Sequence, residues 1–457
     1  MESMNSQDAA LLDAEDEINH MHIATIAVFE GPAPSADEIE RIISARLDRV
    51  PRYRQRVRFV PFDLGPPVWI DDDRFDLNYH IRSTALPQPG SDDQLHTVVG
   101  RVMSRTLDRT RPLWEVWIIE GLAEGRWALL SKTHHCLVAQ RSDLDLLSVL
   151  LDAAPDVAPR SAEPWEPEPR SSGFRLMANS VVQGLTRPRS GWVAFGQVAR
   201  APRRALHELA KFSDGLSSFR TFSNSSLEDA LNGPIGAHRR WRSVRATLAD
   251  LDKIGAAHGG TLDDVVLAVI AQGFRMLLRS RGISLDGRSV RSFAPFPERE
   301  DEGRRAFSGE GFATIVELPT AVEDPRERLA AVRRATDELK KRHEPSTPEP
   351  AVRSPHFSSP AHLAHDARRF ARLAQREVQT VTTNVPGPSQ PLFVAQRRML
   401  FAYPFMPLAA SVRIGVATFS YAGNLGFGVT ADYESASDID VLAAGIETGI
   451  AELLETS

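Results

Sequence analysis

In RWALLSKTHHCLVAQ, residues 126–140, an apolar run over residues 126–131 is followed closely by the adjacent histidines His134 and His135. A short apolar run of this kind is typical of a buried strand. Neutral imidazole accepts a proton near pH 7, so a histidine pair at a strand end suits a general base. Taken alone, such a pair more often has a structural role.

Strands and helices alternate through the first 150 residues. Apolar runs predict strands, and apolar residues recurring every three to four positions predict amphipathic helices. Besides residues 126–131, strands are expected at 22–29 and 114–120, and helices at 92–107 and 142–151. A further helix is expected between a cap at Ser35 or Asp37 and a stop at Pro51. This alternation predicts a mixed α/β layer architecture.

The pattern weakens between residues 152 and 235, where five prolines between 155 and 169 predict an extended linker. Two weakly amphipathic pieces follow, at 174–185 and 192–212. From Arg170 to Arg220 the chain carries nine basic residues and two acidic ones. Such a segment suits a membrane surface or an anionic ligand. A helical crossover with solvated arginines explains it more simply.

The α/β pattern resumes at Arg242 and continues to the end of the chain. Thr261 precedes a strongly apolar helix at residues 262–278. Strands are expected at 311–318, 379–384, 412–421 and 425–433, and a last helix at 438–454. Residues 345–360 are rich in proline and serine, which predicts a surface loop.

Bulk composition narrows the class of protein. With 457 residues, 42% hydrophobic and 25% charged, the chain can form two or three globular domains, and its net charge of −6 gives no indication of nucleic-acid binding. A single cysteine, Cys136, excludes an intrachain disulfide and fits a reducing compartment. The polar residues 1–16 do not resemble a signal peptide, and no 18-residue apolar run predicts a membrane span. A cytoplasmic protein is expected.

Several separated motifs appear together and in a fixed order. The pair His134-His135 resembles the start of the HHxxxDG signature of coenzyme A-dependent acyltransferases. The series of matching segments is Met21-His22, LDRTRPLW at 107–114, His134-His135, LNGPIGAHRR at 231–240, DDVVLA at 263–268, TNVPGP at 383–388 and SYAG at 420–423. The chain thereby resembles the bacterial wax ester synthase/diacylglycerol acyltransferases, including the mycobacterial triacylglycerol synthases, over nearly its whole length.

The resemblance implies a fold of the α+β sandwich type with two chloramphenicol acetyltransferase-like domains. We place them at residues 1–154 and 236–457, joined by a linker and helical crossover at 155–235. The histidine motif would lie in a tunnel between them. The implied reaction transfers an acyl group from long-chain acyl-coenzyme A to diacylglycerol or a long-chain alcohol. Acyl-coenzyme A is a co-substrate, and the sequence carries no signature of a bound cofactor or a metal.

The resemblance also implies roles for individual residues. His135 would be the general base, with His134 beside it in the motif, and Cys136 is expected to pack rather than react. The expected substrate-binding residues are Asn384, Gly387, Asp264, Arg239, Arg240 and Gln140, with the two arginines suited to coenzyme A phosphates. Because the implied substrates are lipids, peripheral contact with a membrane or lipid droplet is compatible with the sequence. The oligomeric state is not predicted.

Three motifs depart from the family pattern. The motif Asp-Gly is replaced by Ala139-Gln140, the usual Asn before the VVLA helix is Asp263, and Arg413 occupies a segment that differs from relatives. Asp143 and Asp145 are candidate substitutes for the missing carboxylate. Two further hypotheses therefore stand beside an active diacylglycerol acyltransferase. One is an impaired paralogue that binds acyl-coenzyme A or lipid without turnover, and the other is an acyltransferase with a different acceptor.

Overall fold

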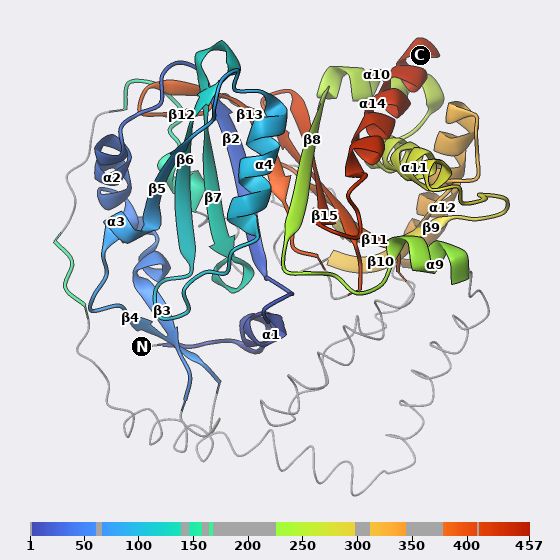
Figure 1. The fold of residues 1–457 in the computed structure, drawn as a ribbon. Helices are drawn as coiled ribbons and strands as arrows, with labels where there is room; N and C mark the ends of the chain where they lie inside the picture. Colours follow the sequence, from blue (N-terminus) through green and yellow to red (C-terminus); the bar gives the residue numbers. More distant parts are fainter. Residues whose placement is uncertain are drawn as a thin grey trace, which may run out of the picture.

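Two six-stranded sheets lie side by side in the protein, each with its own covering helices (Figure 1). A computed structural model describes residues 2–60, 66–138, 146–157, 164–167, 225–297, 311–343, 378–408 and 411–457. Most of the predicted linker, the basic segment at 170–220, the loop at 345–360 and Ala139-Gln140 lie outside the described residues. The division into domains at 154 and 235 stays a prediction.

The first sheet has the strand order β12-β13-β2-β7-β6-β5. Its strands are β2 (His22–Phe29), β5 (Ile81–Ala85), β6 (Trp114–Leu122), β7 (Arg126–His134), β12 (Phe393–Val394) and β13 (Arg397–Phe405). One face packs on α4 (Asp92–Met103), and the other on α1 (Ser6–Ala14), α2 (Ala36–Ser44) and α5 (Leu146–Leu150). The central strands β2, β7 and β6 are therefore buried on both faces along most of their length, which explains their apolar sequences.

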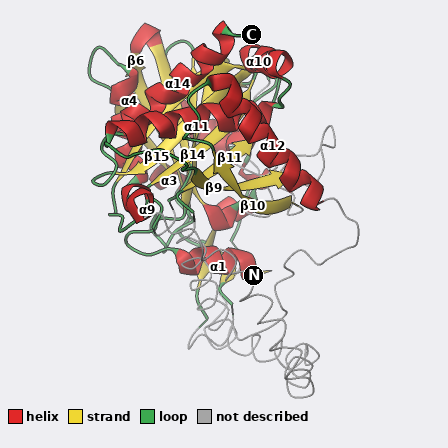
Figure 2. Cartoon of the chain, turned by 90° about the vertical axis from the view of Figure 1, so that its right-hand side faces the viewer, coloured by secondary structure: helices red, strands yellow, loops and turns green. Residues whose placement is uncertain are grey.

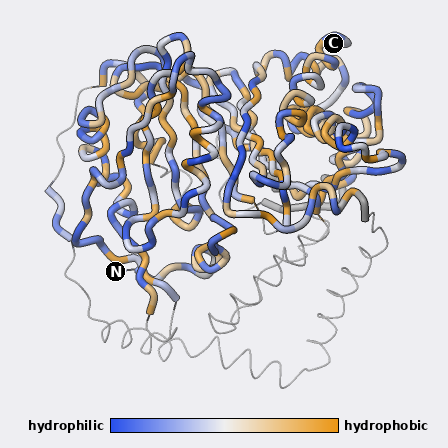
Figure 3. Tube along the Cα trace, in the orientation of Figure 1, coloured by the Kyte–Doolittle hydropathy of each residue, from blue (hydrophilic) through white to orange (hydrophobic). Residues whose placement is uncertain are grey.

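The second sheet has the order β10-β9-β11-β14-β15-β8. Its strands are β8 (Arg239–Thr247), β9 (Val290–Pro297), β10 (Gly311–Leu318), β11 (Thr380–Val385), β14 (Ile414–Tyr421) and β15 (Asn424–Asp432). A layer of four helices covers one face (Figure 2): α10 (Leu248–His258), α11 (Leu262–Ser280), α12 (Pro325–His343) and α14 (Ile439–Glu455). The colouring by hydropathy in Figure 3 follows this layering, with apolar colour along α11 and the adjoining strands.

Smaller elements complete the described chain. A three-stranded sheet is formed by β1 (Glu2–Ser3), β4 (Val68–Asp71) and β3 (Gln55–Arg58), and short helices lie at α3 (Leu77–His80) and α9 (Ser225–Leu231). Turns of 3₁₀ helix occur at η1 (Leu47–Arg49), η2 (Pro51–Arg54), η4 (Ala123–Gly125) and η5 (His135–Leu137). In the described ranges no helix combines the length and the apolar character that a membrane crossing requires.

A crossover joins the two halves of the chain. Strands β12 and β13 come from the C-terminal half, yet β13 pairs antiparallel with β2 in the first sheet, from Met399 opposite Phe29 to Phe405 opposite Ala24. The predicted C-terminal domain therefore supplies two strands to the first sheet. Sequence reasoning did not anticipate this, because nothing local to residues 393–405 identifies their distant partner.

Glycines allow β13 to lie directly against β15. A Cβ atom on Gly428 would lie 1.8 Å from the carbonyl oxygen of Pro404, and one on Gly426 would lie 2.3 Å from that of Ala402. The indole N–H of Trp241 in β8 donates to the Pro404 carbonyl at 3.1 Å. Backbone contact without intervening side chains thus holds the two sheets together at this crossing.

The local predictions agree well with the observed elements. The predicted helix at 262–278 is α11, the strand at 311–318 is β10, and the pair at 412–421 and 425–433 is the β14–β15 hairpin. Ser35, rather than Asp37, caps α2, because its side chain accepts the N–H of Glu38. The helix predicted at 92–107 ends earlier, at Met103, where Ser104 forms the C-cap. The predicted mixed α/β architecture is confirmed.

Replacing Gly428 by alanine should destabilise the crossing of β13 and β15. The added methyl group would overlap the backbone carbonyl of Pro404, which cannot move without shifting β13. We therefore expect the free energy of unfolding to fall by about 1–3 kcal/mol. Urea unfolding of Gly428→Ala measures this loss.

The matched control is Gly236→Ala, whose new Cβ would meet Asp432 Oδ1 at an ordinary 3.6 Å. Equal stability of the two variants would contradict the close backbone approach at Gly428.

Candidate active site

The two histidines of the motif occupy different positions at the end of β7. His134 is the last residue of the strand, is fully buried, and lies opposite His22 in the antiparallel pairing of β2 and β7. The rings of His22 and His134 meet edge to face at 5.8 Å between centroids. The Nδ1 atom of His134 accepts the backbone N–H of Cys136 at 3.1 Å. His134 thereby caps the 3₁₀ turn η5.

His135 is the first residue of that turn and is only partly buried. Its backbone N–H donates to the carbonyl of Met21 at 2.8 Å. Burial lowers the pKa of its imidazole to about 4, with the neighbouring His134 as a second cause. The ring is therefore neutral at pH 7 and carries one nitrogen able to accept a proton.

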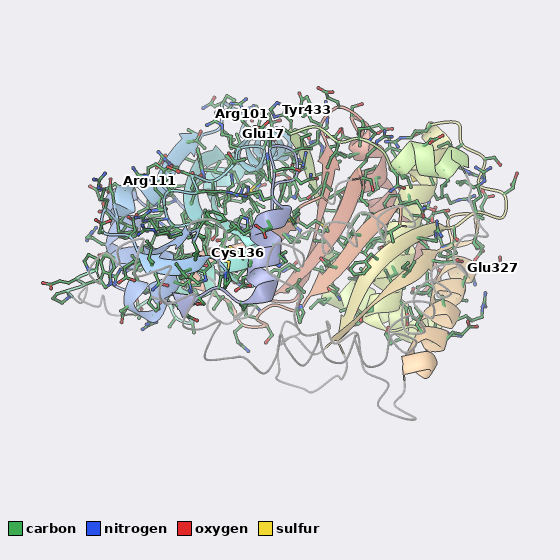
Figure 4. All side chains as sticks on the ribbon, turned by 90° about the horizontal axis from the view of Figure 1, so that it is seen from below. Glu17, Arg101, Arg111, Cys136, Glu327 and Tyr433 are labelled. Carbon is green, nitrogen blue, oxygen red and sulfur yellow. The ribbon has the colours of Figure 1, made fainter. Side chains whose placement is uncertain are left out.

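Cys136 is buried in the apolar core between the first sheet and its covering helices, close to α1 (Figure 4). Burial raises the pKa of its thiol, so the sulfur stays protonated and a poor nucleophile. This placement agrees with the expected packing role.

A buried carboxylate lies behind the histidines. Glu15 follows α1, and its side chain is 4% exposed. Oε2 of Glu15 is 2.7 Å from Nη2 and 3.0 Å from Nε of Arg109, and it faces Nε2 of His134 at 3.6 Å. Oε1 lies 2.8 Å from Nε2 of His22. Burial by itself would raise the pKa of Glu15, but interactions with His134 and His22 outweigh it and place that pKa well below its usual range.

Lys132 adds a buried cation on the same strand. Its ammonium donates to the carbonyls of Val102, at 3.0 Å, and of Arg105. Val102 lies in the last turn of α4 and Arg105 just beyond its C-cap, a position where a cation is favoured by the helix dipole. Burial lowers the pKa of Lys132 to about 8. The residue ties α4 to the strand that ends in the histidines.

In the second half, Asn384 lies at the end of β11 beside the start of α11. Its Nδ2 donates to Asp263 Oδ1 at 2.6 Å, and its Oδ1 accepts from the hydroxyl of Thr418 at 2.7 Å. Gly387 donates its N–H to Ser420 Oγ at 2.9 Å, and a Cβ there would lie 2.0 Å from the Ser420 carbonyl oxygen. Asp263 thus takes the hydrogen bond of Asn384, and Gly387 is required by close backbone packing.

Asp264 is buried in a structural position. Its carboxylate accepts the N–H of Thr261 at 2.8 Å in a capping box and the hydroxyl of Thr336 at 2.6 Å. These bonds start α11 and hold α12 against it. Both carboxylate oxygens therefore accept hydrogen bonds from the protein, and the contact of Asp264 with substrate stays a prediction.

The two predicted phosphate-binding arginines differ in exposure. Arg239 is 4% exposed, and its guanidinium donates to the carbonyls of Gly236, His238 and Ile18. Arg240 is partly buried, stacks on the Tyr433 ring at 4.1 Å and donates from Nε to the Tyr433 carbonyl. Arg239 joins the two halves of the chain, whereas the bond and the ring contact of Arg240 are both made with Tyr433 in the second half.

Ala139, Gln140, Asp143 and Asp145 lie outside the described residues. Arg413 donates to the carbonyl of Asp229 in α9 at 2.8 Å. Within the described residues, no group of three or more His, Cys, Asp and Glu side chains is arranged to hold a metal ion.

Comparisons with known proteins identify the family of the chain. The wax ester synthase/diacylglycerol acyltransferase catalytic domain matches residues 4–266, and the WS/DGAT C-terminal domain matches residues 311–454. The chain belongs to the wax ester synthase/diacylglycerol acyltransferase family. A relative from Mycobacterium tuberculosis, named "Probable diacyglycerol O-acyltransferase tgs1", is 34% identical over 100% of this chain and 96% of its own.

Two solved structures share the fold of this family member. The wax ester synthase/diacylglycerol acyltransferase of Marinobacter aquaeolei VT8 is 24% identical, with a TM-score of 0.71 over 99% of this chain and 98% of its own. A starter condensation domain of rhizomide synthetase RzmA, in complex with C8-CoA, is 12% identical, with a TM-score of 0.51 over 100% of this chain and 94% of its own. The predicted two-domain acyltransferase architecture is thereby confirmed as a fold class.

Sequence reasoning missed Glu15 and Arg109 as members of the site. Glu15 belongs to the polar run DAEDE at 13–17, which resembles an ordinary solvated segment. Arg109 stood within a matching motif, but its partner lies 94 residues earlier in the chain. The presence of Met21-His22 in the series of matching segments was the one sign in the sequence that the N-terminal region belongs to the site.

The family member should lose stability as the pH falls below about 6.5, the usual pKa of histidine. Burial lowers the pKa of His22 to about 3 and those of His80, His96 and His135 to about 4. Unfolding in acid therefore takes up protons that the native state does not bind. The free energy of unfolding should be highest above pH 6.5 and fall toward pH 4, by up to about 1.4 kcal/mol per pH unit for each histidine.

Urea unfolding midpoints at pH 7.5, 6.0 and 5.0 measure this slope. His96→Gln removes one buried imidazole at the contact of α4 with β8, where His96 bonds Ser243, and it should flatten the slope. A midpoint independent of pH would contradict the neutral, buried state of these rings.

Proposed function

We propose that this protein transfers the acyl group of a long-chain acyl-coenzyme A to the hydroxyl of diacylglycerol, making triacylglycerol, with a long-chain alcohol as an alternative acceptor. His135 is the general base. One observation carries this proposal: the imidazole of His135 is neutral at pH 7 and lies on a turn whose backbone is held by hydrogen bonds. His135 N–H donates to the Met21 carbonyl, and Cys136 N–H donates to the His134 ring. The names of the family and of the mycobacterial relative support the choice of acceptor.

The reaction then follows from the chemistry of a neutral base. His135 accepts the proton of the acceptor hydroxyl as the oxygen attacks the thioester carbonyl. The tetrahedral intermediate collapses, the carbon–sulfur bond breaks, and the coenzyme A thiolate takes up the proton from the imidazolium. No acyl-enzyme is needed, and the buried, protonated Cys136 is unsuited to form one.

Acyl-coenzyme A is the proposed co-substrate. C8-CoA is bound in the RzmA condensation domain, whose fold this chain shares. We propose that Arg240 contacts the phosphates, because its Nη atoms are not committed to carbonyls as those of Arg239 are. A paired or exposed guanidinium is a good phosphate ligand.

The acceptor side is proposed at the end of β11. Within the described residues, Asn384 uses one N–H on Asp263 and its oxygen on Thr418. Its second N–H can donate to an ester or hydroxyl oxygen of the substrate. Gly387 keeps the adjoining backbone close to β14, and Gln140 stays a proposed contact from sequence. Because the acceptor and product are lipids, we propose a cytoplasmic protein with peripheral contact to a membrane or lipid droplet.

Replacing His135 by alanine should abolish acceptor-dependent release of coenzyme A from palmitoyl-coenzyme A in the presence of diacylglycerol. The loss of a general base costs about 10²–10⁴-fold in rate. Thiol release is followed with a chromogenic disulfide, and folding is checked by circular dichroism.

The matched control is His258→Ala, which removes a histidine from the last turn of α10 and should leave the rate unchanged. Retained activity in His135→Ala would overturn the assignment of the base. Folded wild-type protein without release for any alcohol acceptor would instead favour a lipid-binding paralogue.

A further inference from the structure

Glu15 is a buried carboxylate that the proposed chemistry does not use. It contacts three side chains from three separate segments: Arg109, His22 in β2 and His134 in β7. A buried carboxylate is costly unless it is paired, and Arg109 supplies the pairing with two nitrogens on one oxygen. The second oxygen is then directed at His22. The carboxylate of Glu15 therefore faces Nε2 of both His22 and His134.

The contacts of His134 determine which of its nitrogens carries the proton. Nδ1 accepts the N–H of Cys136, so a neutral His134 must carry its proton on Nε2. Nε2 is the nitrogen that faces Glu15, at 3.6 Å. This distance is beyond hydrogen-bond range, but the carboxylate still favours a ring orientation that points N–H toward it. Glu15 and the turn thus select the same tautomer and the same ring orientation.

Both backbone anchors of His135 depend on neighbours of Glu15. On one side, the N–H of His135 donates to the carbonyl of Met21, the residue before His22. On the other side, the N–H of Cys136 donates to the ring of His134. A shift of either histidine ring or strand end would therefore turn the peptide units that flank His135.

We propose that Glu15 is a positioning residue, which holds His22 and His134 so that the turn His135–Leu137 presents His135 to the reacting groups. The kinetic part of this inference rests on the proposed function, in which His135 is the base. Glu15 itself does not touch the substrate. Arg109 serves the same purpose indirectly, because it fixes the carboxylate and also donates to the carbonyl of Leu12 at the end of α1.

The kinetic test compares Glu15→Gln with Glu17→Gln. Both remove one negative charge, but Glu17 is exposed, two residues further along the chain (Figure 4). In Glu15→Gln we expect kcat per folded molecule to fall by up to about 100-fold while KM for palmitoyl-coenzyme A changes less than about twofold. Glu15→Asp, which keeps the charge, should recover part of the loss, and Glu17→Gln should match the wild type. A lower melting temperature with unchanged kcat would overturn the positioning role.

A second measurement does not depend on activity. Imidazole ¹⁵N–¹H correlation spectra of histidine-labelled protein identify the tautomer of each ring, with His134 and His135 assigned from His134→Gln and His135→Gln. We expect a protonated Nε2 on His134 in the wild type, and altered His134 and His135 signals in Glu15→Gln only. Unchanged signals in Glu15→Gln would overturn the inference. Altered signals in a protein without acyltransferase activity would support Glu15 as the residue that positions the turn and would count against the proposed function alone.

Discussion

The pairing of β2 with its two neighbours sets the positions of the histidines and joins distant parts of the chain. Strand β2 pairs with β7 on one edge and with β13 on the other, and it therefore joins the first and last parts of the chain in one sheet. The same register places His22 opposite His134 and brings the carbonyl of Met21 within hydrogen-bond distance of the backbone N–H of His135. A slip by one residue would turn every side chain of β2 to the opposite face and remove both relationships.

Three buried charged groups are each stabilised by specific partners. Glu15 is paired with Arg109, Lys132 is held by carbonyls at the end of α4, and Arg239 is enclosed by carbonyls from both halves of the chain. Because leaving any of these groups without its partner would be costly, the segments that supply the partners are held in place. The rigid backbone around His135 is therefore an electrostatic as well as a packing effect. In the proposed reaction, this rigid backbone keeps the neutral imidazole of His135 in one position during acyl transfer.

Elements with a strong local pattern could be predicted from the sequence, and contacts between distant segments could not. The apolar helix at residues 262–278 and the strands at 412–421 and 425–433 were predicted from local sequence, and the structure confirms them as α11, β14 and β15. The placement of β13 beside β2 depends on a partner more than 360 residues away, which no local pattern reveals. Glu15 was hidden in a polar run, and Arg239 was favoured as a phosphate ligand although its surroundings bury it. The histidine motif was found because its two rings are adjacent in sequence.

The crossover of β13 also affects how the chain is made. Until residues 397–405 have left the ribosome, one edge of β2 has no strand beside it, although the rest of the first sheet is already synthesised. An open edge of this kind is a template for pairing with other chains. The first sheet can therefore be completed only after most of the polypeptide has been synthesised. Protein production from this chain is consequently most exposed to misassembly during that interval.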